Sequence, residues 1–464
     1  MKRLYKGIEI VTENVPELDT GFIPIEAFFR AFEKQAGQRM EIAIVGNEDV
    51  TTTYETRIHG TAEMRDVDCY YAEKLIKFLL WSRGGYRIAI AGAPEIAEHI
   101  REVFSAKGSR SFDYFFMNRV YEKTPEVLSL PFDAMPQKKV LSHHIGRNLS
   151  GCRIGFDAGG SDRKVSAVID GESVYSEEVV WFPKTEEDPQ YHYEEIVNAF
   201  KTAASKMPRV DAIGVSSAGV YIGNETKVAS LFLKVPPDKF QTRVKDIYIR
   251  AAKEIGDVPL VVANDGDVTA LAGSMSLGVN NIMGIAMGTS QAVGYVDENG
   301  SITGWLNELA FAPVDLSDSA PQDEWSGDFG VGCKYFSQDA VIRLALLAGI
   351  KIDESLTLAE KLKEIQGLSE SGDAKALAIF RDIGKYLAHS IPFYYRFYKM
   401  DHILLMGRVT SGVGGSIMVE EAKRVLKEQY PDLTEKINLI LPDEKSRRVG
   451  QSIAAASLPE IEVK

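Results

Sequence analysis

Cysteine is scarce in this sequence, and its scarcity excludes several kinds of site. The chain has 464 residues and three cysteines, Cys69, Cys152 and Cys333, which lie too far apart to form a Cys-x-x-Cys metal or redox motif. We expect reduced thiols in a cytoplasmic protein. An iron–sulfur cluster would lack a suitable set of cysteine ligands.

Positive charge and long apolar runs are also lacking. The formal net charge of −13 disfavours nucleic acid or an anionic membrane as a partner. The sequence has no run of about 18 apolar residues that could span a bilayer, and its first residues lack the apolar core of a signal peptide. We therefore expect a soluble protein that binds no nucleic acid and no membrane. Any phosphate must be bound by amides, a few cations or a metal.

The length exceeds what one hydrophobic core usually serves, so two or three domains are expected. The first 148 residues alternate predicted strands and helices and form an α/β domain whose role the sequence does not indicate.

The acidic stretch at residues 315–332 lacks the spacing of an EF-hand and is predicted to be a solvated loop.

A glycine-rich turn lies between two predicted strands, at Asp157-Ala158-Gly159-Gly160-Ser161. Its two glycines leave the backbone amides accessible to an oxyanion. No helix opens after the glycines as in a dinucleotide fingerprint, and no Gly-Lys-Ser/Thr follows as in a Walker A loop. A phosphate-binding loop and a plain hairpin turn are the two interpretations.

Two later strands end in similar groups. Residues 258–263 form an apolar strand that delivers Asn264 and Asp265 to the start of a small-residue helix, although Asn and Asp are also common helix caps. The strand at residues 281–287 ends in Gly288-Thr289-Ser290 and continues as a second strand. This repeats the pattern of the first hairpin, and two such hairpins could hold one polyphosphate from both sides.

Together these motifs resemble the actin/hexokinase/chaperone ATPase superfamily and, within it, the ROK family of sugar kinases and repressors. The resemblance covers residues 151–464. Its four motifs, in family order, are Asp157-Ala-Gly159-Gly160-Ser161, Asn264-Asp265, Gly288-Thr289-Ser290 and Gly407-Arg408-Val409-Thr410-Ser411.

The resemblance implies a two-lobed actin-like ATPase (ribonuclease H-like) α/β fold with an additional N-terminal α/β domain. The expected division is residues 1–148 for the N-terminal domain, 151–275 plus 443–464 for the first lobe, and 276–442 for the second lobe. A homodimer is also an expectation from the resemblance.

The activity that the resemblance implies is ATP-dependent phosphoryl transfer to a hydroxyl of a sugar or sugar-like polyol. Asp265 would be the general base, Asn264 and Glu308 would bind the sugar, and Asp157 would help position Mg²⁺. ATP would be bound by Gly159, Gly160, Ser161, Gly288, Thr289, Ser290, Gly407, Arg408 and Gly412.

The sequence departs from the family on the sugar side. The zinc-binding histidine corresponds to Phe311, little more than Cys333 remains of the cysteine run, and a sugar-binding glutamate corresponds to Tyr335. Zinc is therefore not expected, and two hexose contacts are lost. Arg408 replaces a glycine where adenine packs, so its side chain either stacks on the base or blocks it.

These departures keep an alternative open: a non-catalytic sensor or regulator that binds a sugar or nucleotide with a degenerate kinase fold. Retention of Asp265 favours the enzyme, whereas Arg408 and the lost sugar contacts favour the sensor. The DNA-binding domain of the repressor branch is not evident in the sequence.

Overall fold

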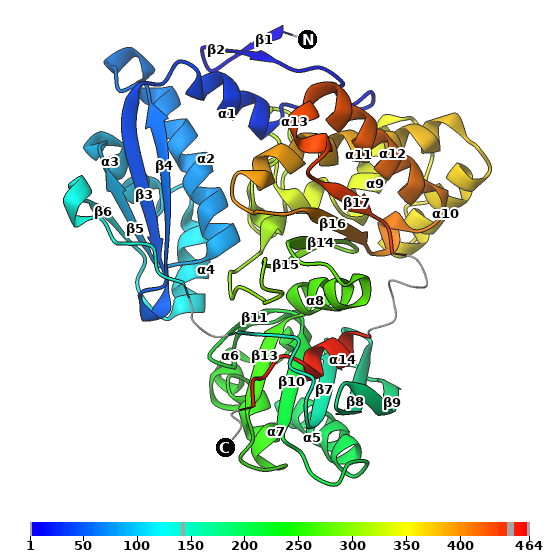
Figure 1. Ribbon diagram of the computed structural model, residues 1–464. Helices are drawn as coiled ribbons and strands as arrows, with labels where there is room; N and C mark the ends of the chain where they lie inside the picture. Colours follow the sequence, from blue (N-terminus) through cyan, green and yellow to red (C-terminus); the bar gives the residue numbers. More distant parts are fainter. Residues whose placement is uncertain (1, 141–143, 443–449, 462–464) are drawn as a thin grey trace. The chain divides into compact units, whose positions relative to one another are not determined.

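The computed structural model describes residues 2–140, 144–442 and 450–461, and the chain forms two compact units (Figure 1). Unit 1 comprises Met1–Leu141, Ile285–Val293 and Trp305–Leu441, and unit 2 comprises Ser142–Gly284, Gly294–Gly304 and Pro442–Lys464. The boundary passes through strands β14 (Ile282–Met287) and β15 (Gln291–Val296). The predicted N-terminal domain and most of the predicted second lobe thus lie in one unit. Of the stretch 443–464 assigned to the first lobe, residues 443–449 and 462–464 lie outside the described residues.

Unit 2 is built on a mixed sheet with the strand order β13-β10-β7-β8-β9. These strands are β7 (Cys152–Ala158), β8 (Asp162–Ile169), β9 (Glu172–Val180), β10 (Ala212–Ser217) and β13 (Leu260–Asn264). Strands β7, β10 and β13 run parallel, so their carboxyl ends meet at one edge. The register pairs Ser216 with Asp157 and Ser217 with Asn264.

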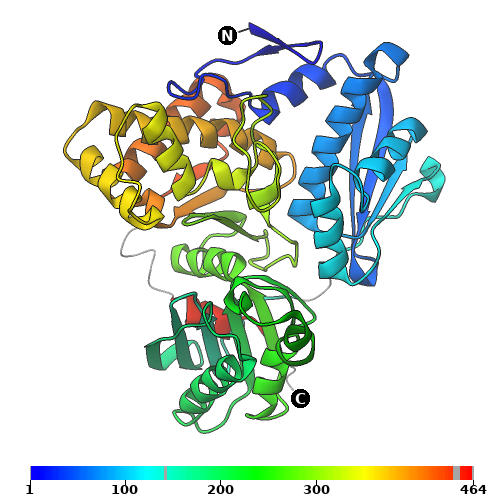
Figure 2. The same ribbon diagram turned by 180° about the vertical axis from the view of Figure 1, so that it is seen from behind.

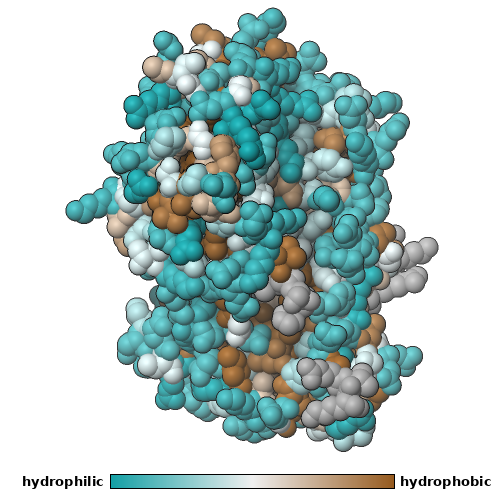
Figure 3. All heavy atoms as spheres, turned by 60° about the vertical axis from the view of Figure 1, so that its left-hand side comes forward, coloured by the Kyte–Doolittle hydropathy of each residue, from teal (hydrophilic) through white to brown (hydrophobic). Residues whose placement is uncertain are grey.

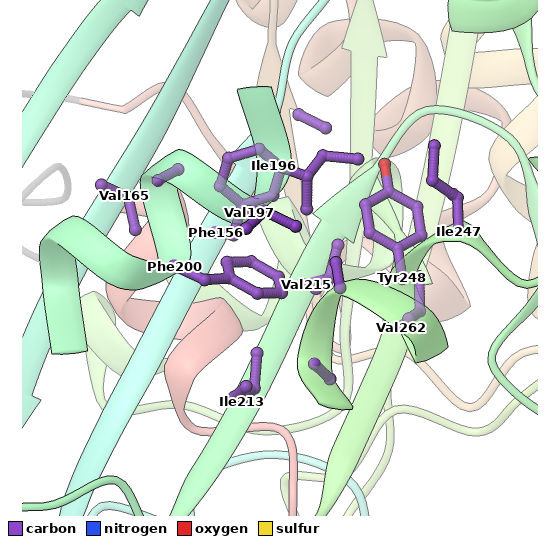
Figure 4. Packing of buried hydrophobic residues seen from close by; sticks show 14 of the residues in the cluster. Phe156, Val165, Ile196, Val197, Phe200, Ile213, Val215, Ile247, Tyr248 and Val262 are labelled. Atoms are coloured by element: carbon purple, nitrogen blue, oxygen red, sulfur yellow. The ribbon is translucent and has the colours of Figure 1, made fainter. Parts of the chain in front are cut away.

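Helices α5 (Pro189–Ala204) and α7 (Ile247–Lys253) cover one face of this sheet. Figure 4 shows the aromatic and aliphatic side chains that meet there, among them Phe156, Phe200 and Val215. Each large apolar side chain buried in this way contributes about 1.5–3 kcal/mol relative to exposure. The core therefore holds the strand ends in place.

Helix α14 (Gln451–Ala456) packs on β7 and β10 because two glycines face it. Gly155 and Gly214 are paired in register, and a Cβ on either would lie 1.7 Å from the carbonyl oxygen of Ser452 or Ala455. Any larger residue would push the helix away from the sheet.

Unit 2 is completed by β11 (Val220–Ile222), β12 (Glu225–Val228), α6 (Pro237–Lys239) and α8 (Asp265–Leu277).

The N-terminal part of unit 1 is an α/β domain, as predicted. Its elements are β1 (Lys2–Tyr5), β2 (Ile8–Val11), α1 (Ile25–Glu33), β3 (Gln38–Val45), β4 (Thr51–Ile58), α2 (Arg65–Arg83), β5 (Arg87–Ala91), α3 (Pro94–Val103), α4 (Ser111–Tyr121) and β6 (Glu126–Ser129). The sheet order is β4-β3-β5-β6. Figures 1 and 2 show helix α2 running along this sheet.

The rest of unit 1 contains a sheet with the order β15-β14-β16-β17 and a group of helices. These elements are α9 (Gln338–Leu347), α10 (Leu358–Glu370), α11 (Ala374–Tyr395), β16 (His402–Met406), α12 (Val413–Gln429), α13 (Pro431–Thr434) and β17 (Asn438–Ile440). Three of these helices begin at side-chain caps: Ser337 for α9, a capping box at Thr357 for α10, and Asp373 for α11.

Aromatic and ionic contacts join the N-terminal domain to helix α11. The ring of Phe393 lies 5.0 Å from Phe29 and 4.8 Å from Phe78, measured between centroids. Arg396 lies 2.7 Å from carboxylate oxygens of both Glu26 and Glu33. These contacts explain why the two sequence segments belong to one unit.

The acidic stretch at residues 315–332 is mostly loop, as predicted, but only part of it is solvated: Asp318 and Glu324 are exposed, whereas Asp315 and Asp323 are buried. Asp315 is buried and accepts hydrogen bonds from the Ile23 amide at 2.8 Å and the Tyr335 hydroxyl at 2.6 Å. Asp328 pairs with Lys77 at 2.8 Å and with Arg110. Burial opposes ionisation of Asp328, but these cations hold its pKa well below its usual range. The prediction of solvation was wrong for Asp315 and Asp328 because their partners come from distant parts of the chain.

Within the described ranges, no helix is both long and apolar enough to cross a bilayer. Hydrophilic residues cover most of the face drawn in Figure 3, with hydrophobic residues showing between them.

Candidate active site

Asp157 lies at the carboxyl end of β7, in a hydrogen-bonded chain that crosses the sheet edge. The Ser216 hydroxyl donates to Asp157 Oδ1 at 2.9 Å, and Gln451 Nε2 donates to Ser216 Oγ at 2.8 Å. Gln451 Nε2 also lies 3.1 Å from the carbonyl oxygen of Asp265. This chain links β7, β10, α14 and the start of α8.

The environment of Asp157 disfavours its charged form. Burial raises the pKa of Asp157 to about 6, the hydrogen bond from Ser216 opposes the rise, and the negative charge of Asp265 adds to it. Within the described residues, Asp157 Oδ2 makes no hydrogen bond. A carboxylate with one oxygen held and the other available fits Mg²⁺, which usually takes one or two protein carboxylates plus phosphate oxygens.

Asp265 is the first residue of α8, and Asn264 caps this helix. Asn264 Oδ1 accepts from the Gly266 amide at 2.8 Å, and its Nδ2 donates to the Gly219 carbonyl at 2.8 Å. The capping role that the sequence left open for Asn264 is therefore observed. Its amide group retains one N–H and one lone pair that these two bonds do not use.

The Asp265 carboxylate is half-buried. Burial raises the pKa of Asp265, while the Gly266 amide, 3.1 Å from Oδ1, and the charge of Lys184 oppose the rise. A raised pKa makes a carboxylate a better proton acceptor at neutral pH, provided that it stays ionised.

The glycine-rich turn between β7 and β8 is fastened by Trp181. Trp181 Nε1 donates to the Gly159 carbonyl at 2.7 Å, and the Trp181 amide donates to the Ser161 carbonyl at 3.1 Å. The carbonyl groups of the turn thus point to Trp181, while Gly160 and Ser161 are exposed. Asp157, Asp265 and this turn all belong to unit 2.

In unit 1, the structure brings together two of the predicted phosphate and nucleotide segments. Gly288, Thr289 and Ser290 form the turn between β14 and β15, with the Gly288 amide donating to the Ser290 carbonyl at 3.0 Å. Gly407 follows β16 with φ of 93°, and a Cβ there would lie 2.4 Å from the carbonyl oxygen of Met287. Glycine at position 407 therefore permits the two segments to touch.

Arg408 and Gly412 lie between β16 and α12. The Arg408 side chain is exposed, and its carbonyl accepts from Gln366 Nε2 at 2.7 Å. Gly412 has φ of 70° at the N-terminus of α12. The exposed guanidinium is accessible to a ligand.

Glu308 lies in unit 1 on a loop that the end of helix α2 holds. The Glu308 amide donates to the Trp81 carbonyl at 2.9 Å, and the Asn307 amide donates to the Ser82 carbonyl at 3.1 Å. The side chain of Glu308 is half-buried. The N-terminal domain thus fixes the backbone of a residue predicted to bind sugar.

Phe311 and Tyr335, at the two positions where the family resemblance implies lost sugar contacts, are both buried. The ring of Phe311 lies 4.6 Å from that of Trp81, and the Tyr335 hydroxyl donates to Asp315 at 2.6 Å. Both side chains are committed to the interior of unit 1.

Among the described residues, no group of three or more histidine, cysteine and acidic side chains could hold a metal ion. Cys333, the remnant of the cysteine run, lies with its sulfur 3.5 Å from Asp323 Oδ1. Burial raises the pKa of this thiol, and the Asp323 charge adds to the rise. Such a protonated thiol is a poor zinc ligand.

Sequence reasoning missed three residues near these carboxylates: Ser216, Gln451 and Lys184. Ser216 had a signal, since it lies near the carboxyl end of an apolar strand, β10, that pairs with parallel neighbours. Gln451 and Lys184 had no such signal in the sequence. Gln451 is brought to this edge of the sheet by the packing of α14, and Lys184 by the turn after β9.

Comparison with known proteins finds similarity only among solved structures: no family model and no curated protein matches the chain. The ROK hexokinase from Thermus thermophilus matches at 18% identity over 66% of this chain and 97% of that chain, with a TM-score of 0.50. A ROK family transcriptional regulator, a homologue of the E. coli Mlc protein, matches at 18% identity over 67% and 79%, with a TM-score of 0.48. A ROK family glucokinase from Streptomyces griseus, in complex with glucose and AMPPNP, matches at 17% identity over 66% and 98%, with a TM-score of 0.47.

The match to the hexokinase confirms the predicted fold, and it covers about two thirds of the chain. Over that part, the chain has the two-lobed actin-like ATPase fold of ROK family proteins, to which it adds an N-terminal α/β domain.

Proposed function

We propose that this chain is an ATP-dependent phosphotransferase that acts on a hydroxyl of a sugar or sugar-like polyol. The observation that carries the proposal is Asp265, a half-buried carboxylate of raised pKa in the same unit as Asp157 and the glycine-rich turn. The fold shared with a ROK hexokinase supports it. Phosphoryl transfer needs little more than positioning, charge stabilisation and a base near the hydroxyl.

In this proposal, Asp265 accepts the proton of the sugar hydroxyl as that oxygen attacks phosphorus. Asn264, through its remaining N–H and lone pair, and Glu308 bind other hydroxyls of the sugar. Asp157 would hold Mg²⁺ through its available oxygen, and a metal held there would supply charge neutralisation for the phosphates. The proposed phosphate and nucleotide contacts are Gly159, Gly160, Ser161, Gly288, Thr289, Ser290, Gly407, Arg408 and Gly412.

The burial of Phe311 and Tyr335 bears on which sugar is the substrate. Since neither side chain is available to hydrogen-bond a hydroxyl, the substrate has fewer polar contacts than the resemblance to hexose kinases implies. We therefore propose to screen amino sugars and polyols as well as hexoses.

The test is ATP consumption with Mg²⁺ against that panel, with Asp265→Asn as the key variant. Loss of the base is expected to lower kcat by about 10²–10⁴-fold, while ATP affinity changes by less than about twofold because the phosphate contacts remain. Asp238→Asn is a matched control, since Asp238 is exposed on α6 in the same unit. Unchanged turnover in Asp265→Asn would remove Asp265 from the role of base.

The second candidate function is a non-catalytic sensor of a sugar or nucleotide. The burial of Phe311 and Tyr335, together with the exposed Arg408 side chain, favours it. The same panel separates the two: no turnover with any member, combined with thermal stabilisation by a sugar or nucleotide, would support the sensor.

A further inference from the structure

Lys184 follows strand β9 in a turn whose position is fixed by contacts on both sides. Trp181, three residues earlier, is buried and bonds to the Gly159 and Ser161 carbonyls. His192 Nε2 lies 2.8 Å from the carbonyl oxygen of Pro183. The backbone that carries Lys184 is thus held against the glycine-rich turn.

The side chain of Lys184 lies over Gly160. A Cβ built on Gly160 would be 2.8 Å from Lys184 Nζ and 2.9 Å from its Cε. The Lys184 charge also acts on the Asp265 carboxylate, whose pKa it lowers against the effect of burial. The ammonium therefore lies against the glycine-rich turn, and its charge is felt by the proposed base.

An exposed lysine is ordinarily only solvated, but the ammonium of Lys184 lies over Gly160 of the glycine-rich turn and not beside a carboxylate. Lys164, on the adjacent strand β8, lies 3.5 Å from Asp162 and 3.8 Å from Glu178. Lys184 forms no ion pair with any described residue, although this chain carries an excess of acidic side chains. An unpaired ammonium held beside open backbone amides is a site for an anion.

We propose that Lys184 binds the transferred phosphoryl group and stabilises its charge in the transition state. This inference rests on the proposed kinase function. A lysine provides a compact positive charge with three donors, which suits the equatorial oxygens of a phosphoryl group. The bond between the γ-phosphorus and the β–γ bridging oxygen breaks, the bond from the sugar oxygen to phosphorus forms, the hydroxyl proton passes to Asp265, and ADP leaves. Lys184 takes no part in this proton transfer.

The experiment compares Lys184→Met, Lys184→Arg and Lys253→Met in the full chain. Lys253 is an exposed lysine at the end of α7 in the same unit, so its variant controls for loss of one positive charge. Turnover of the best sugar in the panel and calorimetric binding of inorganic tripolyphosphate are both measured. Lys184 is exposed, so thermal unfolding should show all variants to be folded.

Lys184→Met is expected to lower kcat by about 10²-fold or more, with the KM for the sugar changed less than about twofold because Lys184 is not assigned to the sugar. Tripolyphosphate affinity should fall about 10-fold through loss of a charge-assisted contact. Lys184→Arg should recover part of the kcat and part of the tripolyphosphate affinity. Lys253→Met should match the wild type in both measurements.

The outcomes separate the two proposals. Wild-type turnover that Lys184→Met leaves unchanged would overturn the role of Lys184 and leave the kinase standing. Absence of turnover, with tripolyphosphate binding that depends on Lys184, would overturn the kinase and retain Lys184 as an anion-binding residue. If the wild type binds no tripolyphosphate, or if the variant binds it equally well, the inference fails.

Discussion

At the scale of single residues, Asp157, the proposed metal contact, also affects the stability of the folded chain. Its pKa is about 6 in the folded chain, above the ordinary value, because it is buried. Between about pH 4 and about pH 6 the folded state therefore binds more protons than the unfolded state, and stability falls as the pH rises through this range. A shift of this size corresponds to about 3 kcal/mol.

Asp157→Asn removes this buried charge and keeps an acceptor for Ser216. The variant should be more stable than the wild type by up to about 3 kcal/mol above about pH 6, and the difference should vanish below about pH 4. Urea unfolding across this pH range measures it. Phosphoryl transfer should be lost, which would be a case of stability sacrificed for function.

Asp211→Asn provides the control of opposite sign. Burial acts to raise the pKa of Asp211. Hydrogen bonds from the Cys152 amide and from Arg209 outweigh this effect, so the pKa of Asp211 is lowered. Its contribution to stability is therefore present at neutral pH and lost as the pH falls, and Asp211→Asn should be the less stable chain at neutral pH. Equal pH profiles for Asp157→Asn and the wild type would contradict the raised pKa.

At the scale of elements, the end of helix α2 supports the loop that carries Glu308. The Arg83 guanidinium lies 3.6 Å from the centroid of the Trp305 ring and 4.5 Å from that of Tyr398. Cation–π contacts of this kind stabilise by about 0.5–2 kcal/mol each. The Tyr398 hydroxyl in turn donates to Asn307 Oδ1 at 3.0 Å. The loop geometry is thus coupled to the N-terminal domain.

Arg83→Met should loosen this loop and displace Glu308. We expect the KM for the sugar to rise by about 5–50-fold, corresponding to about 1–2 kcal/mol of lost positioning, while the KM for ATP stays within about twofold. Steady-state kinetics in both substrates measure the difference. Arg65→Met is the matched control, since Arg65 is exposed at the start of the same helix. A rise in both KM values would point to general unfolding and not to the loop.

At the scale of the whole molecule, the N-terminal domain is part of unit 1 and not a separable module. Phe29 and Phe78 are fully buried, and both pack on Phe393 of helix α11. Removing residues 1–141 would uncover these apolar contacts and leave Arg396 without its two carboxylate partners. An independent sensor domain would be expected to have a smaller and more polar interface.

A chain from which residues 1–141 are removed should therefore aggregate or bind a hydrophobic dye. Its uncovered α11 surface resembles the surface of a partly folded state. Size-exclusion chromatography and dye fluorescence, compared with the full chain, measure this. A monodisperse truncated chain with a cooperative unfolding transition would show that the domain is dispensable for folding.

From the sequence by itself, the fold of residues 151–464 could be predicted through the resemblance of four motifs to those of the ROK family. Each motif is local: an apolar strand that ends in glycine, hydroxyl or acidic residues. Strand ends and helix starts follow from such short patterns, so the turn at Gly159 and the position of Asp265 at the start of a helix were predictable. Only the tertiary structure decided that Lys184 lies over Gly160, that Gln451 bonds to Ser216, and that residues 315–332 are partly buried against N-terminal helices. These contacts join residues far apart in the chain, and their geometry depends on the packing of whole elements, which no local pattern encodes.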